Sequence, residues 1–406
     1  MQLLQDAKAF FKRHKNLFQY VWPVYWVYRR SVMALARAIH GMDSNKVIFS
    51  SYYSKFYNDN PRYISEKLHE MRPGTDIVWL FNKSKIDRAV VPEYVRKVQP
   101  ISVRGLVEQA TAMVWVDNVK KSEALSVGRK QYYINTWHGD RGFKRVGADN
   151  DKRRIKSLER LERKCSLMVA GSRFGESTYR TAFDYRGEVL RAGCPRNDIL
   201  LKGDPETTAR VRGALGIPDG AKVLIYAPTY RDAKKEAHAC EIDLARALRC
   251  FEESTGEKWV CLYRAHYMSR GLKLKDLGDR LIDATKWPEM AELLLVSDAL
   301  ISDYSSCTCD FTLTGRPAFL YIDDLDDYVD QNRELYFDLN ESPFLLARNM
   351  DELEALIRET DAEAARKNSR TLDAFFGTSE TGRATEAVCE YIIGKLDESE
   401  KKRAVR

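Results

Sequence analysis

The chain has 406 residues, of which 44% are hydrophobic and 31% charged, so it is long enough for two domains of ordinary globular composition. Its eight cysteines are scattered and form no Cys-x-x-Cys pair, which excludes a zinc-finger spacing and indicates reduced thiols rather than a disulfide scaffold. The net charge of +7 is concentrated at one end, because residues 1–40 carry seven Lys or Arg and one Asp.

Residues 1–40 mix these bases with large aromatic side chains. The uncharged run Leu17–Tyr28 has only twelve residues and contains Pro23, whereas a membrane-spanning helix needs about 20 apolar residues. No small-residue cleavage site follows the run, so it is not a signal peptide. Trp and Tyr beside Lys and Arg are typical of the lipid headgroup region. We expect an amphipathic membrane-association segment over 1–40. The alternative is a helix packed on the main body with its bases in solvent.

Six short apolar runs alternate with helical segments up to a Gly203-Asp204-Pro205 linker. Strands that alternate with helices predict an α/β domain with a parallel sheet, here over residues 41–203. The predicted strands are 46–49, 76–82, 112–117, 132–136, 167–170 and 188–192.

Polar side chains that could bind a ligand follow two of these strands. The strand 132–136 leads directly into Trp137-His138-Gly139, and ligands of α/β sheets bind at the carboxyl ends of strands. This predicts an exposed imidazole on a tight turn, and the alternative is a histidine satisfied by a nearby carbonyl group. Arg196, which follows the strand 188–192, is a candidate ligand for a phosphate group, while Asn197 and Asp198 next to it could equally cap a helix.

A second α/β domain is predicted over residues 204–375, followed by a helix that crosses back and a charged tail over 376–406. Its strands are 222–226, 258–263, 281–284 and one around Leu300-Ile301. Arg, His and Ser side chains that meet at one edge of a sheet suit a pyrophosphate. The alternative for the last of these turns is a helix cap. The polar residues at three successive strand ends are Thr229 and Arg231, then Arg264 and His266, then Asp303, Ser305 and Ser306.

Several familiar sites are absent from the sequence. No Gly-x-Gly-x-x-Gly follows a strand, and there is neither a Gly-x-Ser-x-Gly elbow nor a His-Glu-x-x-His motif. Bases interleaved with aromatics occur only in the N-terminal segment, so we expect no nucleic-acid binding. No carboxylate cluster predicts a metal site; because Asp303 and Asp310 could contribute to one, metal dependence stays open.

Five motifs in order resemble the CDP-glycerol glycerophosphotransferase family of teichoic-acid and capsule polymerases and primases. The resemblance covers residues 46 to 395, and although each motif is short, five in order with fitting spacing are specific. The motifs are Trp137-His138-Gly139, Gly193-Cys194-Pro195-Arg196-Asn197-Asp198, Tyr226-Ala227-Pro228-Thr229-Tyr230-Arg231-Asp232, Ser302-Asp303-Tyr304-Ser305-Ser306 and Leu335-Tyr336-Phe337-Asp338.

The resemblance implies a GT-B fold, in which two Rossmann-like domains face each other across a cleft. It implies a peripheral enzyme on the cytoplasmic face of the bacterial membrane, which transfers glycerol phosphate from CDP-glycerol to a hydroxyl of a lipid-linked acceptor and releases CMP. It further implies that His138 is the catalytic base and that His266 and the turn 303–306 hold the donor phosphates. No cofactor is implied with certainty.

The sequence departs from the family pattern in two places. The family commonly continues Trp-His-Gly with Thr-Pro, where this chain has Asp140-Arg141, and commonly follows the second histidine with Pro, where this chain has Tyr267. The first departure lies on the side expected to face the acceptor, to which we assign Gly139, Asp140 and Arg141. The acceptor and the polyol therefore stay open, as does the choice between primase and polymerase. The rival functions are a CDP-ribitol transferase, a nucleotide-sugar glycosyltransferase and a non-catalytic membrane scaffold.

Overall fold

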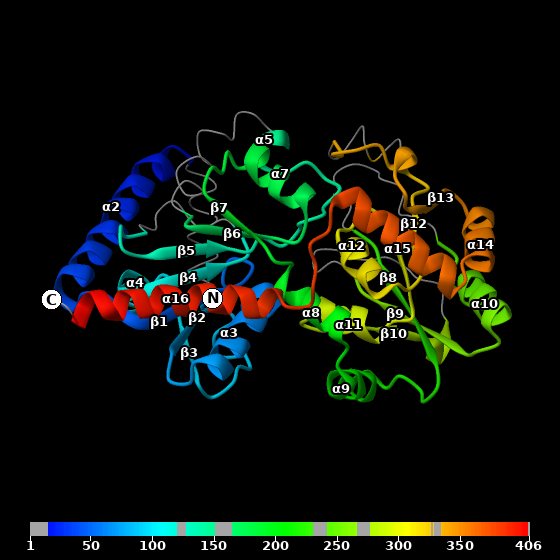
Figure 1. The fold of residues 1–406 in the computed structure, drawn as a ribbon, viewed down its shortest axis with the longest axis horizontal. Coiled ribbons are helices and arrows are strands. Elements are labelled where there is room, and N and C mark those ends of the chain that lie inside the picture. The colour runs from blue at the N-terminus through cyan, green and yellow to red at the C-terminus, as the bar shows by residue number, and fades with distance from the viewer. Residues whose placement is uncertain are drawn as a thin grey trace.

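The computed structural model describes residues 15–119, 127–150, 165–229, 242–265, 277–325, 328 and 334–404. Two parallel sheets, each covered by helices on both faces, lie end to end along the long axis of the molecule (Figure 1). The predicted linker Gly203-Asp204-Pro205 connects α8, which ends at Lys202, to the next helix; Gly203 has a φ of +70° and Asp204 caps that helix. The predicted α/β architecture with parallel sheets is confirmed.

The first sheet has seven strands in the order β3-β2-β1-β4-β5-β6-β7, all parallel. The order changes direction between β1 and β4, and ligands of such sheets bind where the order reverses. The strands are β1 (Asp43–Ser50), β2 (Asp76–Leu80), β3 (Val95–Val98), β4 (Ala112–Asp117), β5 (Tyr132–Asn135), β6 (Leu167–Ala170) and β7 (Glu188–Arg191).

The second sheet has six parallel strands in the order β10-β9-β8-β11-β12-β13, with its reversal between β8 and β11. All ten predicted strands are present, and β3, β12 and β13 were not predicted. The strands are β8 (Lys222–Ala227), β9 (Trp259–Tyr263), β10 (Leu281–Asp283), β11 (Ala299–Ser302), β12 (Ala318–Tyr321) and β13 (Leu345–Ala347).

Helices pack on both faces of each sheet and bury its apolar side chains. The first domain carries α2 (Lys15–His40), α3 (Asp59–Met71), α4 (Val103–Thr111), α5 (Gly147–Asn150), α7 (Arg173–Ala182) and α8 (Asp198–Lys202). The second domain carries α9 (Pro205–Leu215), α10 (Leu244–Thr255), α11 (Met290–Val296), α12 (Cys307–Phe311), α14 (Met350–Glu359) and α15 (Ala362–Phe376).

The last helix, α16 (Ala384–Ala404), returns to the first domain. It follows α15 on the second domain and runs along the first sheet beside α3 (Figure 1). Val388, Cys389, Ile392 and Leu396 are buried among the side chains of the first sheet. The chain therefore passes between the domains twice, once at residue 203 and once before α16.

Helix α2 shows two different faces. One face packs on α4, where Met33 and Ala36 are buried and Arg37 donates to the carbonyl of Ala110 at 3.2 Å and to Gln131 at 2.8 Å. The opposite face is exposed and carries no charge. The helix thus packs on the body, as the alternative interpretation expected, yet leaves an apolar surface outside. That exposed face consists of Val24, Val27, Tyr28, Ser31, Ala34, Leu35, Ala38 and Ile39.

Candidate functional site

The carboxyl ends of β1, β4 and β5 build the first half of the site. After β1 the backbone of Tyr52, Tyr53 and Ser54 lies in the left-handed region, with φ of +43°, +61° and +63°, and Trp137 after β5 has φ of +49°. Non-glycine residues in this region cost free energy and gather at functional sites. Hydrogen bonds hold the conformation in place, because the Tyr52 backbone N–H donates to the Asn118 side chain at 2.9 Å.

His138 is oriented through its Nδ1 atom. Nδ1 lies 2.7 Å from the carbonyl oxygen of Asn118, which can only accept, so Nδ1 carries the proton and Nε2 is left unprotonated in the neutral ring. The Tyr52 ring packs edge-on against the imidazole with centroids 5.4 Å apart, and the Trp137 ring lies 4.5 Å away. Burial lowers the pKa of His138 below its usual value of 6.5, although its bond to Asn118 and the nearby Asp59 oppose the shift. The imidazole is therefore neutral at pH 7.

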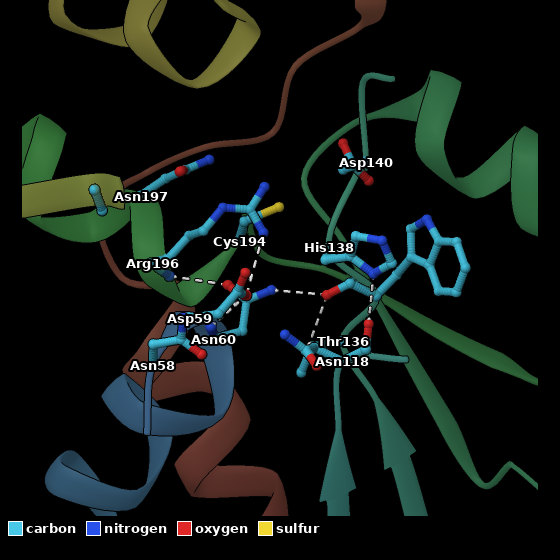
Figure 2. Close-up of polar contacts among 12 residues, drawn as sticks. Asn58, Asp59, Asn60, Asn118, Thr136, His138, Asp140, Cys194, Arg196 and Asn197 are labelled. Atoms are coloured by element: carbon cyan, nitrogen blue, oxygen red, sulfur yellow. Dashed lines mark hydrogen bonds and ion pairs between the residues drawn. The ribbon is translucent and has the colours of Figure 1, made fainter. Parts of the chain in front are cut away.

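Asp59 and Asn60 tie this loop to the residues that follow β7 (Figure 2). Asp59 accepts from the Tyr52 hydroxyl at 2.7 Å and pairs with the Arg196 guanidinium at 3.3 Å. Asn60 donates to the Trp137 carbonyl at 3.1 Å and accepts from the Arg196 backbone at 3.0 Å. Asp59 itself has a φ of +60°. The start of α3 therefore braces the histidine turn against a third segment of the domain.

The carboxyl ends of β8, β9 and β11 build the second half of the site. The buried Asp303 carboxylate accepts from the backbone N–H and the hydroxyl of Thr229, at 2.9 and 3.0 Å, and so joins two strand ends. Ser305 donates to the Cys307 thiol at 3.1 Å. Arg264 is half-buried and donates to the carbonyls of Ala284 and Thr285 through one nitrogen. Within the described part of the chain, the Ser306 hydroxyl has no hydrogen-bond partner.

The two halves meet between the turns 137–139 and 305–306. An ideal Cβ placed on Gly139 would lie 3.9 Å from the Ser306 hydroxyl oxygen, which belongs to the other domain. The Cys309 thiol lies 3.1 Å from the Arg141 carbonyl oxygen close by. The turn that follows β5, which carries His138, and the turn that follows β11, which carries Ser306, therefore lie against each other at the domain boundary.

A buried ion-pair cluster lies beside this boundary. Arg196 donates two bonds to Asp310 of the second domain, at 2.9 and 3.1 Å, and Arg141 lies 3.4 Å from the other oxygen of Asp310. Glu380, which precedes α16, accepts from the Asn197 amide at 2.8 Å and lies 3.6 Å from Arg141. Burial raises the pKa of Glu380 to about 7, against the opposing effect of Arg141. These side chains bind the two domains to each other.

A second interdomain contact joins the start of α3 to the start of α11. The Asp59 backbone N–H donates to Glu289 at 2.7 Å, the Asn58 amide donates to the Pro288 carbonyl at 3.0 Å, and Arg62 pairs with Glu292 at 2.9 Å. Burial, together with the charge of Asp59, raises the pKa of Glu289 to about 7. The segment that braces His138 is thus itself held by the second domain.

The predicted site residues fall into three groups. His138, Gly139, Arg264, Ser305 and Ser306 lie at the boundary. Four others are buried, so in this structure they connect parts of the protein and do not face a ligand: Asp140, Arg141, Arg196 and Asp303. Asp140, for example, accepts from the Gly171 backbone N–H at 3.0 Å and from the Ser172 hydroxyl at 2.6 Å. The Thr229 hydroxyl donates a hydrogen bond to Asp303. Arg231 and His266 lie outside the described residues.

Sequence reasoning missed several residues that shape the site. The turn at Tyr52 and the acid Asp59 follow the first strand, yet the sequence analysis assigned neither of them to the site. Asn118, directly after the predicted strand 112–117, was the one position with a usable signal, because it is polar and at a strand end. Glu289 could not be found, and Asp310 was considered only as a possible metal ligand, since the contacts of both come from the packing of the two domains.

Two searches over the described residues gave negative results. No group of three or more His, Cys, Asp or Glu side chains there has an arrangement that would hold a metal ion. Of the helices in the same residues, none combines the length and apolar character needed to cross a bilayer.

Comparison with known proteins gives a consistent picture. The family model for CDP-glycerol:poly(glycerophosphate) glycerophosphotransferase matches residues 32–394. A teichoic acid poly(glycerol phosphate) polymerase of Staphylococcus epidermidis is 28% identical over 91% of this chain, which spans only 53% of that protein's length. A teichoic acid glycerol-phosphate transferase of Staphylococcus aureus is 27% identical over 86% of this chain and 93% of its own length. The solved structure of a histidine-to-asparagine variant of the wall teichoic acid polymerase TagF with CDPG superimposes with a TM-score of 0.79 at 26% identity, covering 96% of this chain and 98% of that one.

Proposed function

Because the chain belongs to the CDP-glycerol:poly(glycerophosphate) glycerophosphotransferase family, we propose that it transfers glycerol phosphate from CDP-glycerol to a hydroxyl group of a lipid-linked acceptor, with release of CMP. One observation carries the proposal for the site. Gly139, the neighbour of a His138 ring whose Nε2 is left unprotonated, faces the Ser306 hydroxyl across the boundary of two domains, and both turns follow strands at the strand-order reversal or next to it.

His138 acts as the general base. The acceptor hydroxyl gives its proton to Nε2, its oxygen forms a bond to the glycerol-bearing phosphorus, and the bond from that phosphorus to the CMP oxygen breaks. A lowered pKa suits this role, because the base is already unprotonated at pH 7. The Asn118 carbonyl keeps the proton on Nδ1 and, once Nε2 is protonated, stabilises the cation.

The second domain holds the donor. Arg264 lies within electrostatic range of Glu289 and Tyr52, which places its charge near the boundary, and Ser305 and Ser306 offer hydroxyl donors there. Charge-assisted bonds from such groups stabilise a pyrophosphate and the departing CMP. Arg231 and His266 follow neighbouring strands in the sequence and remain predicted donor ligands.

The acceptor is presented at a membrane surface, which the exposed apolar face of α2 contacts. Eight exposed residues without a charge cover this face, and Arg30 at its border stacks on Trp26 with the guanidinium 4.2 Å from the ring centroid. An apolar helix face bordered by arginine and tryptophan suits the headgroup boundary of a bilayer. Binding to anionic lipid vesicles tests this assignment.

The test of the function compares His138→Asn with the parent protein. The asparagine amide can still donate to the Asn118 carbonyl but cannot accept a proton, so turnover should fall by roughly 100- to 10,000-fold while CDP-glycerol binding is retained. The measurement is CMP release with a lipid-linked glycerol-phosphate acceptor. In the parent protein kcat/KM should fall on the acid side with a pKa below 6.5, because a protonated imidazole cannot act as base.

The control is His40→Asn at the exposed end of α2, which should leave turnover unchanged. Full activity of His138→Asn would remove the histidine from the mechanism. The alternatives are tested with the same protein by offering CDP-glycerol, CDP-ribitol and UDP-sugars in parallel. Release of CMP from CDP-ribitol alone would identify a ribitol-phosphate transferase, UDP release a glycosyltransferase, and no release of any nucleotide a scaffold.

A further inference from the structure

The position that a Cβ atom on Gly139 would occupy is open space. Apart from the neighbouring residues His138 and Asp140, such a Cβ meets only two heavy atoms of the described residues within 4 Å, Trp137 Nε1 at 3.8 Å and Ser306 Oγ at 3.9 Å. These two atoms come from different domains. The space therefore lies between the histidine turn and the serine turn.

Nothing in the protein itself requires glycine at this position. The φ of Gly139 is outside the left-handed region, and an alanine Cβ would make only ordinary van der Waals contacts. Other glycines nearby are different, since a Cβ on Gly175 would lie 1.8 Å from Asp140 and one on Gly171 would lie 2.5 Å from Glu380. At those two positions the protein explains the glycine, whereas at Gly139 the structure leaves the space unused.

The atoms that border the space are both hydrogen-bond donors without partners in the protein. Neither Trp137 Nε1–H nor the Ser306 hydroxyl bonds to any of the described residues. The Trp137 ring is fixed by edge-on packing against Phe183, with centroids 4.6 Å apart, and by its contact with the His138 ring. A space lined by fixed donors, with an unprotonated imidazole on the adjoining residue, suits an anionic oxygen.

We propose that this space receives a non-bridging oxygen of the phosphoryl group being transferred, and that Trp137 Nε1–H and Ser306 Oγ–H hold it from the two domains. The inference rests on the proposed function and names the groups that stabilise the charge. During transfer the acceptor oxygen bonds to phosphorus, CMP leaves with the electrons of the broken P–O bond, and the proton goes to His138. The oxygen beside Gly139 keeps its bond to phosphorus throughout and carries part of the negative charge.

The test is Gly139→Ala, which fills the space without disturbing the fold. The melting temperature should stay within a degree or two of the parent, while kcat for CMP release from CDP-glycerol should fall at least 100-fold, the size expected when an oxyanion contact is lost. Gly213→Ala in α9 is the control, because its Cβ would meet nothing within 4 Å and it belongs to neither the turn 137–139 nor the turn 305–306. Parent-like activity of Gly139→Ala would overturn the proposal.

Trp137→Phe tests the same site from the donor side. It removes the indole N–H but keeps an aromatic ring between Phe183 and His138, so kcat should fall tenfold or more while the pKa of the acid limb of the pH profile stays unchanged. A shifted limb with an unchanged plateau would show that the ring only positions His138, which contradicts the proposal. If the parent protein itself releases CMP from no donor, the proposed function fails; if the parent is active and both variants match it, only this inference fails.

Discussion

The strand-end loops of the two sheets differ in how their polar groups are used. In the first domain, Asn118, Asp59 and Asn60 bond to other loops of the same domain, and left-handed backbone at Tyr52 and Trp137 is held by these bonds. In the second domain the turn at Ser305 and Ser306 is half-exposed. Among the described residues, the Ser305 hydroxyl bonds only to a neighbouring thiol and backbone N–H, and the Ser306 hydroxyl has no partner.

This difference fits the parts that each loop plays in the proposed reaction. A general base must be held in one orientation and one tautomer before the substrate arrives, which requires strain and internal bonds. A phosphate group brings its own charge and acceptor oxygens, so the residues that bind it are best left without protein partners. The comparison predicts that changes on the first side cost stability and that changes on the second side cost affinity.

The largest effect is expected from Arg196→Ala. It removes the cation that pairs with the buried Asp59 and leaves Asp310 with Arg141 alone at 3.4 Å, and loss of one partner of a buried pair costs about 3–5 kcal/mol. Thermal unfolding should therefore show a clear drop in melting temperature. Arg186→Ala is the control, because Arg186 is 85% exposed where it pairs with Asp184, and such surface pairs contribute about 0–1 kcal/mol.

The outcome decides between two interpretations of this arginine. The sequence predicted Arg196 as a donor ligand, whereas its contacts in the structure make it a link between domains. If Arg196→Ala melts like Arg186→Ala but binds CDP-glycerol more weakly, the donor-ligand prediction is right and the contrast between the two sides fails.

A smaller effect is expected from the one part of the first domain that lacks a protein partner, the exposed face of α2. The double variant Leu35→Asp and Ile39→Asp places two charges on that face, where the parent residues are 61% and 65% exposed. Loss of two apolar side chains from a lipid interface, each contributing about 1.5–3 kcal/mol, should weaken binding to anionic vesicles by at least tenfold.

Val90→Asp is the control for this surface, because Val90 is 89% exposed between β2 and β3 and away from α2. Vesicle co-sedimentation measures both variants, and their melting temperatures should match the parent. Undiminished binding of the α2 variant would mean that another surface contacts the membrane or that none does.

The sequence predicted one side of this comparison better than the other. His138, Ser305 and Ser306 were predicted because each stands within four residues of the end of an apolar strand, and strand ends are where ligands bind in such sheets. Asp140, Arg141 and Arg196 stand at strand ends too, but their carboxylate and amide partners come from distant segments that only domain packing brings near. The missed strands β3, β12 and β13 are three or four residues long and at or next to the edges of their sheets, too short for a periodic pattern.

The smallest effect is expected from Ser305→Ala combined with Ser306→Ala. Both side chains are half-exposed and make few bonds within the protein, so the melting temperature should hardly change. A hydrogen bond to a charged group contributes about 1.5–3 kcal/mol, so the dissociation constant for CDP-glycerol, measured by calorimetry, should rise roughly tenfold or more. Ser254→Ala, at an exposed serine of α10 in the same domain, should change neither quantity.

The double serine variant distinguishes a structural role of the turn after β11 from a role in donor binding. If the double serine variant loses stability and keeps its donor affinity, the turn after β11 is a structural helix start like the one at Asp204, and the second domain uses its strand ends just as the first does. If affinity falls while stability holds, the two hydroxyls make few bonds in the free protein because the donor phosphates supply their acceptors. The same reasoning then explains why Gly139, facing Ser306 across the boundary, has no side chain.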